Sequence, residues 1–225
     1  VALSHNTYRL AFLILKLNMK PIQKGEMNIF NVIYDFSHSA ILYSIDFDHL
    51  IEVEKIFYNT LQTYWKEHNY LTPQWWFLVI LSIASPITWY KLVDKKRITE
   101  ITSFGLFYGM AAIILDSIGS NAMLWLYPVR LTPFLDPQVY PYDVGIVIIP
   151  FMMVYQKWGK YLKKFFLFSG LLSAFLAFMA EPFMEWLHIY KALTWRHIYS
   201  FLLYWLISLI CWLIIKKFKK LEQKP

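Results

Sequence analysis

The feature that most constrains the fold is a set of long apolar segments, each close to the length that crosses a lipid bilayer. The clearest is the segment between His197 and Lys216, which contains no charged residue. A membrane-spanning helix needs about 20 mostly apolar residues, because the hydrocarbon core is about 30 Å thick. Further segments approach this length at residues 74–92, 101–126, 143–156 and 165–187. The sequence therefore predicts an all-α, polytopic membrane helix bundle of about five transmembrane helices.

The composition supports this class of protein. Hydrophobic residues make up 58% of the chain and charged residues only 16%, whereas an average soluble domain has about 25% charged residues. Trp75, Trp76, Trp89 and Tyr90 stand at the two ends of the first predicted span, where an aromatic belt meets the lipid headgroups. The single cysteine, Cys211, lies in the last apolar segment and is expected to be a small buried apolar residue.

The basic residues between the spans predict the orientation. Along the successive loops and the C-terminal tail, Lys and Arg number 4, 1, 4, 2 and 5. Positively charged loops stay in the cytoplasm, so we expect a multi-pass protein of a bacterial cell membrane with its N-terminus outside and its C-terminus cytoplasmic. The net charge of +7 is spread over separate loops, so nucleic acid is not an expected partner. The expected partners are membrane lipids, and a homo-oligomer is left open.

The N-terminal region differs from the bundle. Within residues 49–70 the apolar side chains recur at helical spacing, which predicts an amphipathic helix on the outer surface or against the bundle. Met27 is a plausible start residue, so the segment before it is treated as a non-native or disordered extension. The resulting divisions are the extension at 1–26, an extracytoplasmic interfacial segment at 27–73, the transmembrane bundle at 74–216 and a basic cytoplasmic tail at 217–225.

Two predicted spans carry a carboxylate, Asp116 or Glu181, on a face of small residues. These small residues are Gly105, Gly109 and Ala112 in the second span, and Gly170, Ala174 and Ala177 in the fourth. Small residues mark the faces where membrane helices approach each other closely. A charge at the centre of a membrane helix costs about 2.5–3.5 kcal/mol, so such residues usually face the protein interior. We therefore expect both carboxylates to face a common chamber near the outer side.

Other polar and aromatic residues are expected at the same membrane level. The candidate acid and base residues are Asp116, Glu181 and Glu185. The candidate ligand-binding residues are Arg130, Asp143, His188, Arg196, Trp125, Tyr127 and Trp186. Glu185 and His188 have the i, i+3 spacing of di-iron helices, but a second such pair is missing from the predicted spans. The sequence therefore predicts no metal site, and it carries no motif for a cofactor.

These residues leave several functions open. The first is a binding protein or sensor whose acidic, aromatic-lined pocket takes a small or lipid-like ligand. The second is a membrane enzyme that acts on a lipid or isoprenoid, with Asp116 and Glu181 as general acid and base. The third is a proton-coupled transporter, although the chain shows no internal repeat. In the fourth, the carboxylates only fix the register of the helices.

Several motifs stand out between residues 75 and 215: Asp116 with Gly119, LWLYP at 124–128, Pro141 with Asp143, Pro150, VYQ at 154–156 and the EPxxEW run that begins at Glu181. As a set they resemble a family of small, functionally uncharacterised multi-pass membrane proteins of spore-forming Gram-positive bacteria. The resemblance implies a bacterial plasma-membrane location. It implies no activity, substrate or catalytic residue, and it does not extend to the N-terminal region.

Overall fold

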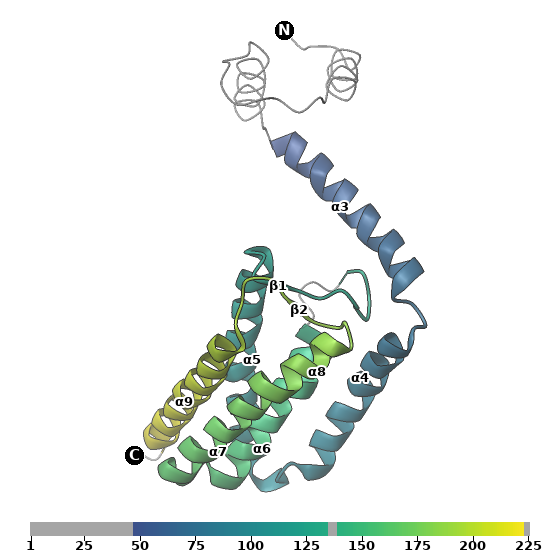
Figure 1. Ribbon diagram of the computed structural model, residues 1–225. Coiled ribbons are helices and arrows are strands. Elements are labelled where there is room, and N and C mark those ends of the chain that lie inside the picture. The colour runs from purple at the N-terminus through teal and green to yellow at the C-terminus, as the bar shows by residue number, and fades with distance from the viewer. Residues whose placement is uncertain (1–46, 135–138, 223–225) are drawn as a thin grey trace, which may run out of the picture. The chain divides into compact units, whose positions relative to one another are not determined.

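The computed structural model of the protein describes residues 47–134 and 139–222, and this part of the chain is almost entirely helical (Figure 1). The predicted all-α bundle is therefore confirmed. In chain order the elements are α3 (Phe47–His68), α4 (Pro73–Leu92), η1 (Lys95–Arg97), α5 (Ile98–Asn121), β1 (Trp125–Leu126), η2 (Val139–Ile148), α6 (Ile149–Trp158), α7 (Leu162–Phe175), η3 (Leu176–Ala180), α8 (Glu181–Trp186), β2 (Lys191–Ala192) and α9 (His197–Glu222).

Four helical segments in the described residues are long and apolar enough to cross a membrane: Pro73–Leu92, Lys95–Asn121, Leu162–Trp186 and His197–Glu222. Large apolar side chains remain exposed along them, as lipid-facing side chains would be, and Ile80 and Leu106 are examples. The chain is therefore a membrane protein with several transmembrane helices.

The third predicted span corresponds to two shorter helical elements, η2 and α6. Tyr140, near the start of η2, has a non-helical backbone (φ −127°, ψ 130°), and Pro150 lies in the first turn of α6. Proline lacks the N–H that a regular helix would use at that position. This part of the bundle is therefore segmented, whereas the neighbouring spans are long helices.

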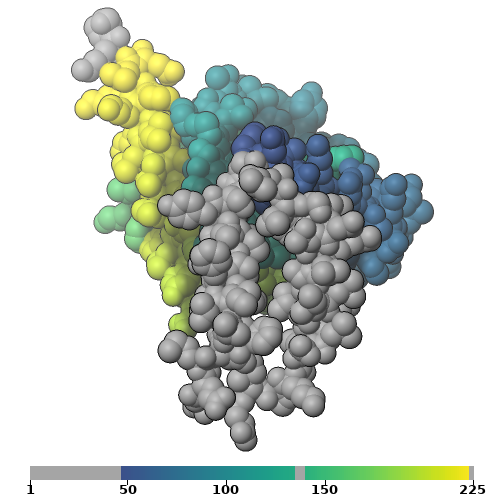
Figure 2. Space-filling model, turned by 90° about the horizontal axis from the view of Figure 1, so that it is seen from above, coloured from purple at the N-terminus to yellow at the C-terminus, as the bar shows by residue number. Residues whose placement is uncertain are grey.

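The bundle helices run alternately up and down, so their connections gather at two ends (Figure 1). α5 packs against η2, α6 and α9, while α7 packs against α6 and α9. Figures 1 and 2 show α9, in yellow, at one side of the bundle beside α5, and Figure 1 shows α4 at the other side against η2. The lysine-rich connections lie at one end, and β1 and β2 lie at the other.

The chain divides into two compact units, Val1–Glu54 and Lys55–Pro225, and the boundary falls inside α3. The predicted amphipathic helix is present as α3, and none of its residues is buried. Its predicted apolar stripe, which includes Leu50 and Phe57, is exposed. The predicted extension at 1–26 lies outside the described residues. The basic tail predicted from residue 217 begins inside α9, which continues to Glu222.

The small-residue face of α5 packs as predicted. A side chain built at Gly105 would meet Met152, and one at Gly109 would meet Ile148, so both glycines allow α5 to approach the η2–α6 segment closely. The same face ends at Asp116, which is only 6% exposed.

The predicted face of the fourth span is correct at Ala177 and Glu181, but before them it is displaced by one residue. Ser169, Ser173 and Ala177 are fully buried, whereas Gly170 contacts Trp205 of α9. The reason is the π-helical segment η3, in which the N–H of Glu181 donates to the carbonyl of Leu176 five residues earlier. A π-turn rotates the chain less per residue than an α-turn does. Glu181 therefore aligns with the serines and not with the glycine.

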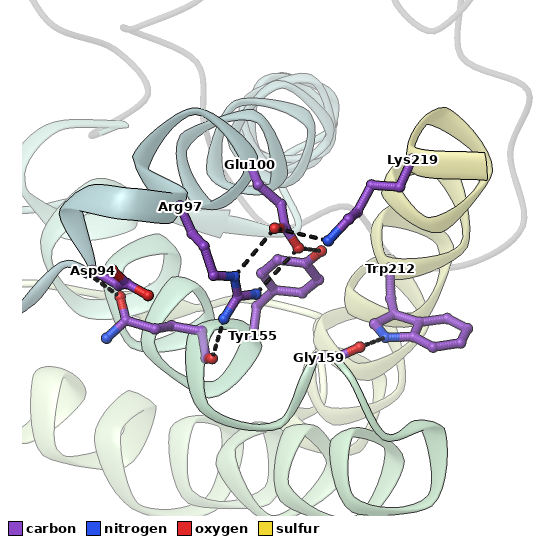
Figure 3. A network of polar contacts seen from close by, with 8 residues as sticks. Asp94, Arg97, Glu100, Tyr155, Gly159, Trp212 and Lys219 are labelled. Carbon is purple, nitrogen blue, oxygen red and sulfur yellow. Dashed lines mark hydrogen bonds and ion pairs between the residues drawn. The ribbon is translucent and has the colours of Figure 1, made fainter. Parts of the chain in front are cut away.

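At the lysine-rich end, a network of polar contacts connects α5, α6 and α9 (Figure 3). The carboxylate of Glu100 accepts from the guanidinium of Arg97 at 3.1 and 3.2 Å and from the hydroxyl of Tyr155 at 2.7 Å. Lys219 of α9 forms an ion pair with the same carboxylate at 3.0 Å. Arg97 also donates to the carbonyl of Gln156 at 3.0 Å. One acidic side chain thus joins three helices.

We predict that Glu100→Gln lowers the thermal stability of the purified protein, because Arg97 and Lys219 lose their shared negative partner. The expected loss is about 1–3 kcal/mol, as for hydrogen bonds to charged groups. Thermal unfolding in detergent, followed by tryptophan fluorescence, measures it. The matched control is Glu222→Gln, which neutralises an exposed carboxylate at the end of α9. Equal midpoints for the two variants would contradict a structural role for the network.

Candidate functional site

A partly open cavity is lined by residues of α5, β1, η2, α8 and α9 and of the loops beside β1 and β2. Its lining includes the carboxylates of Asp116, Asp143 and Glu181, which come from three different elements. The space open to the centre of a water molecule is about 60 Å³, enough for a few waters. Asp116 and Glu181, which the sequence predicted to face a common chamber, both line this cavity.

Asp116 receives two hydrogen bonds from the loop that follows α5. The indole Nε1 of Trp125 donates to its Oδ1 at 2.7 Å, and the hydroxyl of Tyr127 donates to the same oxygen at 2.8 Å. Burial, followed by the nearby charges of Asp143 and Asp116, raises the pKa of Tyr127 well above its usual value. The hydroxyl therefore keeps its proton and remains a donor at neutral pH.

The short strands β1 and β2 hold this loop over the end of the bundle. They pair antiparallel, with Trp125 opposite Ala192, and the carbonyl of Leu124 accepts from the N–H groups of Leu193 and Thr194. The pairing connects the α5–η2 loop to the α8–α9 loop. It also brings the rings of Trp125 and Trp195 to a centroid distance of 4.9 Å at one wall of the cavity.

Gly119 makes room for the indole of Trp125. A Cβ at this position would lie 2.0–2.6 Å from three atoms of the Trp125 ring, which is far inside van der Waals contact. The ring therefore lies directly against the backbone of α5, one turn after Asp116. Only glycine permits this approach, and the approach lets Nε1 reach the Asp116 carboxylate.

Glu181 obtains its donors from α9. The hydroxyl of Tyr204 donates to Oε1 at 2.8 Å, and Nδ1 of His197 lies 2.8 Å from Oε2. The other ring nitrogen of His197 lies 3.5 Å from Oε2 of Glu185. A doubly protonated imidazole can donate at both nitrogens, so His197 links the two glutamates of α8 to the first turn of α9.

Asp143 differs from the other two carboxylates. It is 6% exposed, and its Oδ2 atom is buried with no hydrogen-bond partner in the part of the chain that the structure describes. Tyrosine rings surround this region: those of Tyr142 and Tyr190 are stacked at 6.3 Å, and that of Tyr127 lies 5.6 Å from that of Tyr142. Burial also raises the pKa of Tyr190, so its hydroxyl stays neutral.

Two other predicted site residues lie near the cavity without lining it. Arg130 is buried, its backbone N–H donates to Oδ1 of Asn69 at 2.8 Å, and its Nε donates to the carbonyl of Tyr127 at 3.0 Å. It therefore fixes the loop that carries Tyr127. Glu185 accepts from the N–H of Ala192 in β2 at 3.1 Å. Both residues support the site through their neighbours.

The structure places Trp186, His188 and Arg196 on the exposed surface, outside the cavity, and Trp186 is 73% exposed. The prediction assumed that the helix that carries Glu181 continues beyond Trp186, but α8 ends at that residue. His188 then adopts a positive φ of 58°, which turns the chain away from the helical path. The predicted convergence of these three side chains is therefore wrong.

Three further residues belong to the site but were not predicted from the sequence. Tyr190 and Tyr204 line the cavity, and His197 contacts Glu181. His197 stands immediately before the apolar segment of the last span, and this place at the outer edge of a span is the sequence feature that could have indicated a partner for a buried glutamate. In the described residues, no group of three or more His, Cys, Asp or Glu side chains is arranged to hold a metal ion.

Comparisons of the chain with protein families, with curated proteins and with solved structures find no match.

We predict that Gly119→Ala displaces Trp125 and costs about 1–3 kcal/mol or more of stability, as overpacking does. Thermal unfolding checks the loss, with Gly109→Ala as the control because its Cβ would meet only the end of the Ile148 side chain. A second measurement tests the mechanism. If the loss comes from the broken indole contact, Asp116→Asn destabilises the Gly119→Ala protein less than it destabilises the wild type. Additive effects would contradict the coupling.

Proposed function

We propose that the chain is a multi-pass protein of the bacterial plasma membrane that binds a small ligand in the acidic, aromatic-lined cavity, and that this cavity lies in the outer half of the membrane. The observation that supports this most directly is the meeting of Asp116, Asp143 and Glu181 in one hollow. Burying carboxylates in a membrane bundle is costly, and residues of this kind usually serve a function.

The cavity gives less support to a role in which the carboxylates only fix helix register. Such carboxylates would be expected to have all their oxygens paired inside a filled core. Here Asp143 retains a buried oxygen without a partner among the described residues, and it lies beside a space of about 60 Å³. A ligand or ordered water would supply the missing donor.

The dimensions favour a small ligand over the alternatives. A space of about 60 Å³ is too small to enclose an isoprenoid or an acyl chain, so the lipid-acting enzyme has less support. A transporter needs a path to the other end of the bundle. The described core instead contains the rings of Phe104, Tyr108, Phe151 and Phe165, each fully buried in one hydrophobic cluster.

We predict that Ala112→Phe abolishes ligand binding, because Ala112 lines the cavity and a phenyl ring would fill it. A thermal-shift screen of small soluble compounds against the detergent-solubilised full chain provides the test. A ligand at 100 times its Kd stabilises by about 2.7 kcal/mol. The control is Ala122→Phe, at an exposed position after α5. A binder lost only in Ala112→Phe supports the function, and failure of all small compounds to stabilise the wild type contradicts it.

The orientation is proposed from the distribution of basic residues. The basic segments at 91–97 and 157–164 and the end of α9 lie at one end of the bundle, and the cavity residues Trp125 in β1 and Tyr190 before β2 lie at the other end. Cytoplasmic loops carry the excess of Lys and Arg, so the cavity end faces outward. Membrane lipids then contact the exposed apolar side chains of the spans.

We predict that a cysteine at Thr194 reacts with a membrane-impermeant maleimide in intact cells, whereas one at Lys217 reacts only after lysis. Both positions are exposed, and they lie in the β2–α9 loop and near the end of α9. Cys211→Ser provides the background, because the native cysteine is buried. The opposite labelling pattern would place the cavity on the cytoplasmic side and contradict the proposed orientation.

A further inference from the structure

Three acidic side chains line the cavity, and no lysine, arginine or histidine is among its described lining residues. The acids are Asp116, Asp143 and Glu181. His197 contacts Glu181 from outside this lining. The hollow therefore offers carboxyl oxygens to a molecule that enters it, and such oxygens form their strongest hydrogen bonds with cationic donors.

The hydrogen bonds leave one carboxylate available to a ligand. Asp116 accepts from Trp125 and Tyr127, and Glu181 accepts from its α9 partners. The buried Oδ2 of Asp143 has no hydrogen-bond partner among the described residues. A buried carboxylate oxygen without a donor is costly, so Asp143 marks the point at which a ligand would place an N–H group.

The walls of the cavity suit a positive charge. The tyrosine rings at positions 127, 142 and 190 form a connected group, and the indoles of Trp125 and Trp195 form another wall. The faces of such rings attract cations, most strongly where water is excluded. The indole N–H of Trp125 and the hydroxyl of Tyr127 already donate to Asp116. The faces of these rings therefore remain to attract a cationic ligand.

The size of the cavity and the arrangement of its carboxylates indicate which class of cation it could bind. The described carboxylates do not form a group that could hold a metal ion. The space of about 60 Å³ admits an ammonium group with a few carbon atoms. We infer that the ligand of the proposed binding function is a small primary ammonium compound, whose charged nitrogen donates to Asp143 and faces the tyrosine and tryptophan rings. This inference rests on the proposed function and names its ligand class.

The test uses the full chain in detergent and three probes that share a three-carbon chain. These are n-propylammonium, its neutral analogue 1-propanol, and the anion propionate, with ionic strength matched by sodium chloride. We expect n-propylammonium alone to raise the unfolding temperature in a saturable manner. In Asp143→Asn its affinity should fall about tenfold or more, since a charged hydrogen-bond partner is lost. In Ala112→Phe the effect should disappear, because the cavity is filled.

Several results would overturn the inference. Stabilisation by 1-propanol or propionate equal to that by n-propylammonium would remove the requirement for positive charge. An unchanged affinity in Asp143→Asn would remove the proposed contact. If Asp143→Asn does not fold, the Ala112→Phe variant decides, because an n-propylammonium effect that persists there arises outside the cavity. A neutral compound from the screen whose binding is lost in Ala112→Phe would leave the binding function standing while the ammonium class fails.

Discussion

A carboxylate inside a membrane bundle must find its hydrogen-bond donors within the protein, because lipid tails offer none. This requirement organises the cavity end of the molecule. Asp116 takes its donors from the loop after α5, and Glu181 takes its donors from the start of α9. Each acid therefore holds a later segment of the chain against its own helix, and β1 and β2 connect the loops beside these segments to each other.

Most of the donors at this end are neutral aromatic side chains. Tryptophan and tyrosine can bury a ring in apolar surroundings while the N–H or O–H reaches a polar partner. Trp125, Tyr127 and Tyr204 each do so here. A neutral donor stabilises a negative charge without cancelling it. These three aromatic donors thus help to bury the acids without adding a positive charge themselves.

Hydropathy and helical spacing predicted the bundle, the long spans and the inward face of Asp116, because these follow from local periodicity. The same periodicity failed after Leu176, where a π-turn changes the rotation per residue, and after Trp186, where His188 leaves the helical path. It could not identify His197 or Tyr204 as partners of Glu181. That pairing depends on how α9 is placed against α8, and tertiary packing sets this placement.

Buried carboxylates have different partners at the two ends of the bundle, and this difference indicates the end at which a ligand would bind. At the lysine-rich end Glu100 is paired with Arg97 and Lys219, so its charge is compensated by cations of the chain itself. At the cavity end the described lining contains three carboxylates and no basic side chain. In the first arrangement both carboxylate oxygens of Glu100 are engaged by partners from the chain, so the carboxylate joins helices and has no oxygen left for an external cation. In the second, Asp143 has a buried oxygen without a hydrogen-bond partner among the described residues, so this end can receive a cation from outside the chain.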